Sequence, residues 1–110
     1  MSQERTAVVV LTTVADEETG DRIARTLVEE HLAACVSRTK VRSTYRWRGK
    51  LEDDSEALLV IKSFEDLCPR LERRLAELSS YEVPEFIVLD ARGVGASYLA
   101  WMSESCPPRA

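Results

Sequence analysis

The chain has 110 residues, of which 45% are hydrophobic and 31% charged, as in an ordinary globular protein. Fifteen Lys and Arg residues against nineteen Asp and Glu residues give a net charge of −4. A mildly acidic surface repels phosphate backbones, so the composition disfavours non-specific nucleic-acid binding and leaves open a local basic patch. We expect one domain over residues 1–110, with flexible ends at 1–6 and 106–110.

The N-terminal segment contains no recognisable targeting signal. Residues 1–6 are polar and are not followed by the long apolar core of a signal peptide. The apolar run at residues 7–11 is far shorter than the roughly 20 residues that a membrane-spanning helix needs. We therefore expect a cytoplasmic protein with no membrane association.

Residues 7–14 are rich in β-branched side chains and nearly continuously apolar, which predicts a central strand. Asp16 follows as a helix N-cap, and acidic residues occupy the first turn after it. Apolar residues then recur at helical spacing, so the helix is expected to run to about Leu32. His31 lies beside this apolar stripe and is expected to be a partly buried, hydrogen-bonded helix residue.

Residues 35–47 change to a period of two, and Arg48-Gly49 is a turn signal before a second strand at 50–63. The predicted hairpin is long, and Tyr45 and Trp47 fall on one face of it. A two-stranded arm that outreaches its own domain exposes backbone edges and aromatic rings, so it normally has a partner chain. We expect Tyr45 and Trp47 at an oligomer interface; alternatively, they cover the sheet of their own protomer.

A second helix is expected after the hairpin. Ser63 and Asp66 resemble a capping box, and Pro69 is placed near the first helical turn. A leucine stripe at helical spacing follows, at Leu67, Leu71, Leu75 and Leu78.

Residues 84–90 are predicted to form the fourth strand, and the apolar run at 86–89 indicates that this strand is buried. A short terminal helix is expected around residues 98–102, ending before Pro107-Pro108. The resulting order is strand, helix, strand, strand, helix, strand, helix. It predicts an α+β, ferredoxin-like split βαβ plait with helices on one face of the sheet.

Three sequence blocks at residues 32–36, 43–50 and 81–85, together with 11–13 and 98–101, resemble the CutA divalent-cation tolerance family. The resemblance covers about residues 8–103 without an obvious gap. It implies a ferredoxin-like protomer in a compact homotrimer, similar in plan to PII-type signalling proteins. It also implies a cytoplasmic protein linked to the tolerance of copper and other divalent metals.

The metal ligands that the resemblance implies are missing from this chain. The family's usual turn carries His-Pro where this sequence has Ser79-Ser80, and some members carry a further His and a Cys where it has Leu78 and Thr12. Copper and zinc prefer imidazole and thiolate donors, which these residues do not supply. We therefore expect weak copper affinity and no confident metal site.

Three residues remain as weak metal candidates: Cys35, Glu82 and Glu85. Oxygen donors suit Mg²⁺ or Ca²⁺, but two carboxylates on one turn seldom bind tightly. The alternatives are structural: Cys35 as a small buried apolar residue, and Glu85 as an acceptor at the subunit seam. Cys68 and Cys106 have no partner in the sequence and are expected to be incidental thiols, with Cys106 in an exposed tail; no C-x-x-C pair occurs.

A ligand cleft is expected between protomers. Lys62 follows an apolar run, so it points into this cleft or pairs with Glu85 or Glu56. The residues expected to line the cleft are Cys35, Lys62, Tyr81, Glu82, Glu85 and Trp101.

These features favour a non-enzymatic trimer that binds and responds to a metal or small ligand. The alternative is a structural or interaction trimer with no metal site of its own. An acylphosphatase-like enzyme would need a glycine-rich loop with an Arg after the first strand, but residues 12–17 contain neither. An RNA-binding plait would need stacking aromatics on its central strands, and residues 8–11 and 57–61 contain none.

Overall fold

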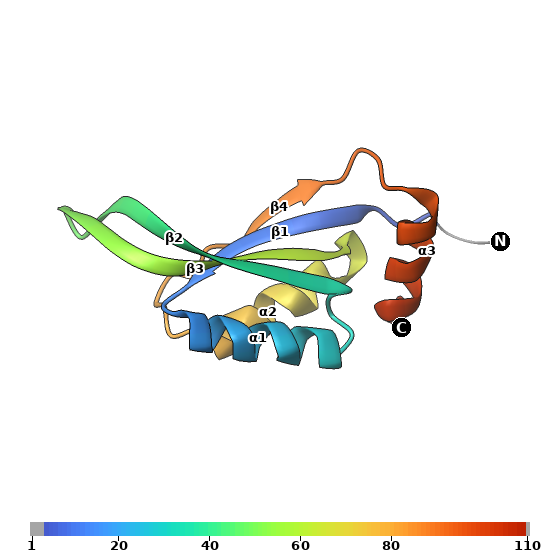
Figure 1. Ribbon diagram of the computed structural model, residues 1–110, viewed down its shortest axis with the longest axis horizontal. Helices are drawn as coiled ribbons and strands as arrows, with labels where there is room; N and C mark the ends of the chain where they lie inside the picture. The colour runs from blue at the N-terminus through green and yellow to red at the C-terminus, as the bar shows by residue number, and fades with distance from the viewer. Residues whose placement is uncertain (1–3, 110) are drawn as a thin grey trace.

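The computed structural model describes residues 4–109, and it contains one four-stranded antiparallel sheet. The strands are β1 (Ala7–Val14), β2 (Cys35–Trp47), β3 (Lys50–Phe64) and β4 (Ile87–Asp90). Their order across the sheet is β2-β3-β1-β4, so β3 lies between the two strands that the first helix connects (Figure 1). This is the predicted split βαβ plait.

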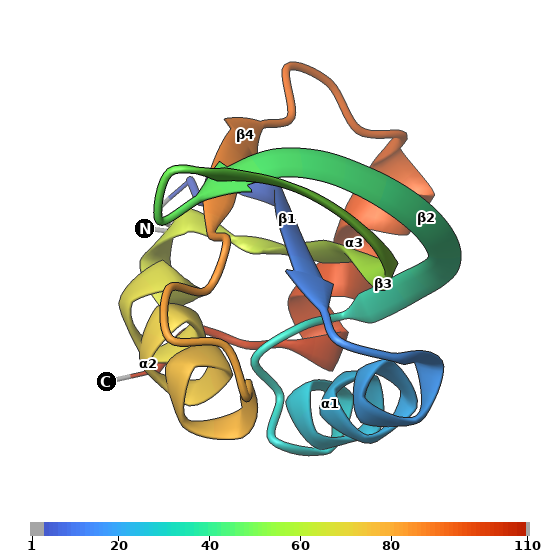
Figure 2. The same ribbon diagram turned by 90° about the vertical axis from the view of Figure 1, so that its left-hand side faces the viewer.

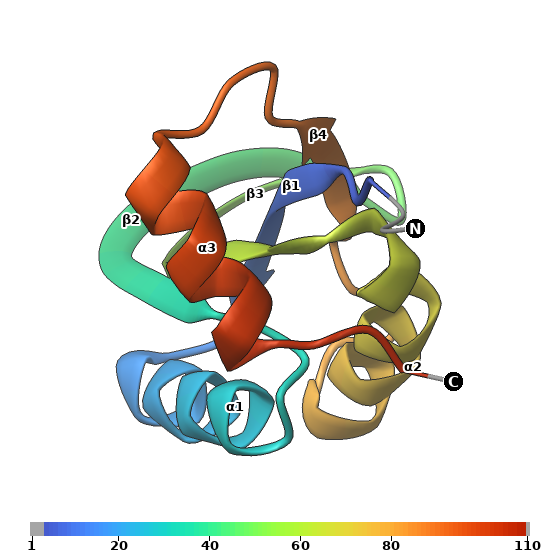
Figure 3. The same ribbon diagram turned by 90° about the vertical axis from the view of Figure 1, so that its right-hand side faces the viewer.

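The helices are α1 (Glu17–Glu29), α2 (Cys68–Leu78) and α3 (Ala96–Ser105), with a short 3-10 turn at Glu65–Leu67 before α2. Figure 2 shows α1 and α2 side by side beneath the sheet. Figures 1 and 3 show α3 at the end of the sheet that lies opposite the hairpin tip. The hairpin projects beyond the helices and lengthens the molecule to 53 Å.

The main core lies between the sheet and helices α1 and α2. Alternate residues of β1 and β3, such as Val10 and Leu59, are fully buried there against Ile23 and Leu27 of α1 and Leu71 of α2. A second, smaller core joins the far end of the sheet to α3 through Phe64, Met102 and Cys106, among others. Both clusters follow from the period-two and helical spacing of the apolar residues.

Helix α1 begins as predicted but ends earlier. The side chain of Asp16 accepts a hydrogen bond of 2.8 Å from the Thr19 amide at its start. At its end the Leu32 amide donates to the Leu27 carbonyl and the His31 amide to the Val28 carbonyl, which is a Schellman motif. The helix therefore stops at Glu29, and His31 is an exposed residue with φ 60 outside the helix. The expectation of a partly buried helical histidine was wrong.

The capping box expected at Ser63 is also absent. Ser63 belongs to β3 and is fully buried, and its hydroxyl donates to the Leu32 carbonyl at 2.7 Å. Helix α2 begins at Cys68 with Pro69 in its first turn and has no side-chain cap. The Ser63 hydroxyl is thus engaged with Leu32 and does not cap α2.

The hairpin forms with the predicted two-residue turn. Trp47 pairs with Lys50 across it, and both turn residues have positive φ, 52° at Arg48 and 81° at Gly49. A two-residue turn with two positive φ values is the type whose twist matches the twist of the flanking strands.

Strand β4 differs from the prediction in length and burial. It starts at Ile87 rather than Pro84, and its side chains are exposed, with Ile87 and Leu89 both 48% accessible. The reason is its place at the sheet edge, where it pairs only with β1. The prediction of a buried strand was wrong for the single protomer.

One face of the sheet has no helix over it within residues 4–109 (Figure 2). Strand alternation and pairing register place the same group of side chains on this face. We call it the open face, and its apolar residues are Val9, Leu11, Leu58, Val60, Ile87 and Leu89.

The described parts of the two chain ends pack against the domain. Arg5 forms an ion pair with Asp66 at 2.9 Å, lies over the Phe64 ring at 3.8 Å, and donates to the Cys106 carbonyl at 3.0 Å. Cys106 is fully buried, so its placement in an exposed tail was wrong. Burial also raises the pKa of its thiol to about 11. Residues 1–3 and 110 of the expected flexible ends lie outside the described residues.

No helix formed by residues 4–109 has both the length and the apolar character needed to cross a bilayer.

Candidate functional site

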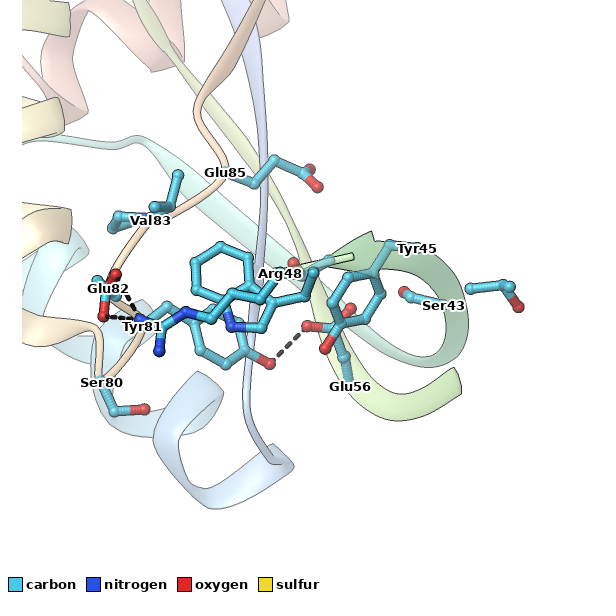
Figure 4. Close-up of a pocket in the computed structure, with 13 residues that line it drawn as sticks. Ser43, Tyr45, Arg48, Glu56, Ser80, Tyr81, Glu82, Val83 and Glu85 are labelled. Carbon is cyan, nitrogen blue, oxygen red and sulfur yellow. Dashed lines mark hydrogen bonds and ion pairs between the residues drawn. The ribbon is translucent and has the colours of Figure 1, made fainter. Parts of the chain in front are cut away.

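A cavity of about 740 Å³ lies where the hairpin meets the turn before β4. Its walls come from β2, from β3 and from residues 80–85 (Figure 4). Three of the predicted cleft residues, Tyr81, Glu82 and Glu85, line it. Together with Glu56 and Tyr45 we call them the hairpin-end group.

Tyr81 and Glu56 form the most buried polar contact of this cavity. The Tyr81 hydroxyl donates to Glu56 Oε2 at 2.5 Å, and Glu56 is only 8% exposed (Figure 4). Burial, followed by this hydrogen bond, raises the pKa of Tyr81. The bond joins the turn before β4 to the base of the hairpin, so it fixes the shape of the cavity.

Glu85 contributes through both its backbone and its side chain. Its carbonyl accepts a 2.6 Å hydrogen bond from the buried Thr12 hydroxyl, which ties the turn to β1. Burial, and then the nearby Glu56 carboxylate, raise the pKa of the Glu85 side chain. The neutral form of the Glu85 carboxyl is therefore favoured more than in water.

The outer rim of the cavity is made of exposed polar contacts. Arg48 donates to both oxygens of Glu82, at 3.0 and 3.1 Å. The Tyr45 hydroxyl donates to Asp54 at 2.5 Å, and this bond raises the pKa of Tyr45 to about 12. Tyr45 remains 38% exposed and Trp47 37% exposed, so their own protomer covers them incompletely.

The other predicted cleft residues lie at the opposite end of the sheet. Lys62 Nζ donates to Ser37 Oγ at 2.6 Å and lies 4.0 Å from Cys35 Sγ, so within the protomer it pairs with neither Glu85 nor Glu56. Cys35 is half-buried.

Helix α3 covers this end with two aromatic rings. The Tyr98 and Trp101 ring centroids are 5.2 Å apart, and Trp101 is 42% exposed. Burial, with the neighbouring Cys35, raises the pKa of Tyr98. We call Cys35, Ser37, Lys62, Tyr98 and Trp101 the α3-end group.

The hairpin-end and α3-end groups do not meet within one protomer. Glu56 and Lys62 belong to the same strand, and the six residues of separation correspond to about 20 Å. Residues that the sequence assigned to one cleft therefore lie in two separate groups on a single chain.

Within residues 4–109, the positions that the resemblance assigns to copper ligands carry no imidazole or thiolate. Ser79 stands where the family was expected to have its usual His, and Thr12 where some members were expected to have Cys. Both have structural roles: the Thr12 hydroxyl donates to the Glu85 carbonyl, and Ser79 Oγ accepts a hydrogen bond from the Tyr81 amide at 3.1 Å. Hydroxyl oxygens are poor ligands for copper. Among residues 4–109 no cluster of three or more His, Cys, Asp or Glu side chains could hold a metal ion.

A comparison with models of known protein families identifies the family of this chain. The family described as "CutA1 divalent ion tolerance protein" matches residues 8–105. The chain belongs to the CutA family.

Individual relatives agree with this assignment. A divalent-cation tolerance protein CutA from Thermus thermophilus is 42% identical over 88% of this chain and 95% of its own length. A CutA protein of Oryza sativa described as chloroplastic is 39% identical over 90% of this chain, which spans only 56% of that longer protein. The crystal structure of Pyrococcus horikoshii CutA in 3 M guanidine hydrochloride superposes with a TM-score of 0.87 at 37% identity, covering 90% of this chain and 98% of that one.

Sequence reasoning did not assign Glu56, Ser37 and Tyr98 to the site. Glu56 carried a signal, because it immediately precedes the apolar run of β3. A carboxylate that begins a buried stretch requires a donor, and the structure provides one in Tyr81. Ser37 and Tyr98 carried no comparable signal, because their partners depend on strand register and on how α3 docks.

Proposed function

We propose that this CutA-family chain is a homotrimeric, non-enzymatic protein that binds a metal or small ligand between protomers. The separation of the hairpin-end group from the α3-end group supports this proposal most directly, and each group is then one half-site. A hairpin-end group and an α3-end group about 20 Å apart on one strand can share a cleft only when different protomers contribute them.

The open face supplies the physical reason for assembly. Its six apolar residues include Ile87 and Leu89, each about half exposed. A contiguous apolar patch of this kind marks an interaction surface, and covering it removes apolar area from water. The exposed rings of Tyr45 and Trp47 would extend the covered area along the hairpin.

Copper remains the metal that the family resemblance suggests, and this chain would bind it weakly. Compartment is also part of the proposal: we expect the cytoplasm, although the rice relative is described as chloroplastic. We expect neither nucleic acid nor a membrane as a partner.

The alternative is a structural or interaction trimer without a metal site of its own. The hydroxyl side chains at positions 12 and 79 favour it, because they are engaged in hydrogen bonds that shape the turn.

Measurement of the molecular mass tests the proposed trimer, and calorimetry tests the proposed ligand binding. Light scattering should return three times the protomer mass, and a single-protomer mass would refute the trimer. Calorimetric titration with Cu²⁺ should show only weak binding. Sub-micromolar Cu²⁺ binding that survives Cys35→Ser would reveal a site that the structure does not explain. Saturable binding of another metal or a nucleotide would favour the ligand-binding function over the structural alternative.

A further inference from the structure

A second cavity of about 420 Å³ lies on the helical side of the molecule, away from the open face. It lies between the C-terminal end of α1 and helix α2, and Arg109 also lines it. Figure 3 shows the segment after α3 running toward α2. Although the chain has a net charge of −4, the charged residues that line this cavity are mainly basic. They are the four arginines Arg70, Arg73, Arg74 and Arg109 and the two glutamates Glu30 and Glu77. We call this cavity the arginine groove.

One arginine holds both carboxylates of the groove. Arg74 donates to the two oxygens of Glu30 at 2.9 and 2.8 Å and to Glu77 at 3.2 Å. The hydrogen bond from Arg74 lowers the pKa of Glu30. One guanidinium therefore engages both acidic groups of the groove, and Arg109 adds a smaller favourable charge interaction with Glu30.

Two further arginines are positioned to receive an anion. Arg109 donates to the Glu30 carbonyl at the end of α1, which offsets the partial negative charge of that helix end. Arg73 is exposed and forms no hydrogen bond or ion pair with any residue from 4 to 109. Each guanidinium has five N–H donors. Arg109 uses one of them in the bond to the Glu30 carbonyl and Arg73 uses none with residues 4–109, so both retain donors for an anion.

Guanidinium groups bind phosphate oxygens through pairs of parallel hydrogen bonds, and several of them together match a multiply charged anion. The cavity volume falls within the range of small-molecule sites. We propose that the arginine groove binds a soluble small molecule that carries two or more phosphate groups. The groove lies on the helical side, so the proposal does not depend on the assembly of the open face.

Calorimetric titration of the full chain with inorganic triphosphate at low ionic strength tests this proposal. Saturable binding is expected for the unaltered chain. The double variant Arg73→Gln/Arg109→Gln should weaken it by about tenfold or more, because two charge-assisted contacts are lost. Arg42→Gln/Arg46→Gln removes the same charge from the distant hairpin, and should change the affinity less than about twofold because salt screens distant charges.

Thermal melting of both double variants checks that each remains folded. The absence of saturable heat with the unaltered chain would overturn the proposal. Equal weakening by the two double variants would also overturn it, because it would show an attraction to net charge rather than to the groove. Binding to vesicles that contain phosphatidic acid, without binding of triphosphate, would contradict a soluble ligand.

Discussion

Tyr81 and Glu56 show how one hydroxyl can decide the cost of a buried charge. Glu56 lies in β3 at 8% exposure, and within residues 4–109 its hydrogen-bond donor is the Tyr81 hydroxyl. A carboxylate that loses its donor inside a protein keeps the full cost of leaving water. Tyr45 makes a bond of the same length to Asp54, but there the carboxylate is exposed and water can replace the donor.

We predict that Tyr81→Phe lowers the free energy of unfolding by about 1–3 kcal/mol, because it leaves Glu56 without its donor. Urea denaturation followed by circular dichroism measures this change. The matched control is Tyr45→Phe, which should cost less than about 0.5 kcal/mol because its partner is solvated. Equal losses for the two variants would mean that burial of Glu56 does not control the energetics.

The hairpin shows how a local turn sets the geometry of a long element. Strands β2 and β3 run as one antiparallel ladder from Cys35 opposite Lys62 to Trp47 opposite Lys50. The tip requires positive φ at two successive residues, and Gly49 has this conformation without cost. Apart from Gly49 and its two neighbours in the chain, no residue from 4 to 109 has an atom within 4 Å of the position that a Cβ at Gly49 would occupy, so a substitution there acts through backbone conformation.

We predict that Gly49→Ala destabilises the hairpin tip by about 1 kcal/mol, because a left-handed conformation is unfavourable with a Cβ. Backbone amides of residues 44–53 should then exchange with solvent about fivefold faster, as measured by NMR hydrogen exchange. Gly93→Ala is the matched control, since Gly93 also has open space around it but no positive φ. Unchanged exchange at the tip after Gly49→Ala would show that the turn does not limit hairpin opening.

The whole protomer is organised around two faces of one sheet. Helices α1 and α2 bury one face, while the open face keeps apolar side chains at the surface. The same face runs from the hairpin to helix α3, so assembly over it would bring the two half-sites of neighbouring protomers within reach. The proposed trimer therefore links the stability of the fold to the formation of the site.

We predict that Ile87→Lys converts the proposed trimer into single protomers, because a buried ammonium group without a partner is strongly unfavourable at an interface. Light scattering measures the change in mass. Val28→Lys is the control: Val28 is 41% exposed on α1, against 48% for Ile87, but it lies outside the open face. Loss of the trimer in both variants, or in neither, would contradict assembly through the open face.

The sequence by itself determined the local elements of this protein. The first two strands have the predicted bounds and the third extends one residue further, because alternation and β-branched residues act within a few positions. The Arg48-Gly49 turn was predictable for the same reason. The order of the expected elements predicted the split βαβ plait, which the antiparallel order β2-β3-β1-β4 bears out.

Only the tertiary structure decided which residues share a site and which apolar runs are buried. Ile87 and Leu89 belong to an apolar run, yet the place of β4 at the sheet edge leaves them exposed. Lys62 donates a hydrogen bond to Ser37 and does not pair with a glutamate. The register of β2 and β3 sets these neighbours, and it depends on residues far apart in the chain. Contacts of this kind depend on the packing of whole elements, and no local sequence pattern encodes them.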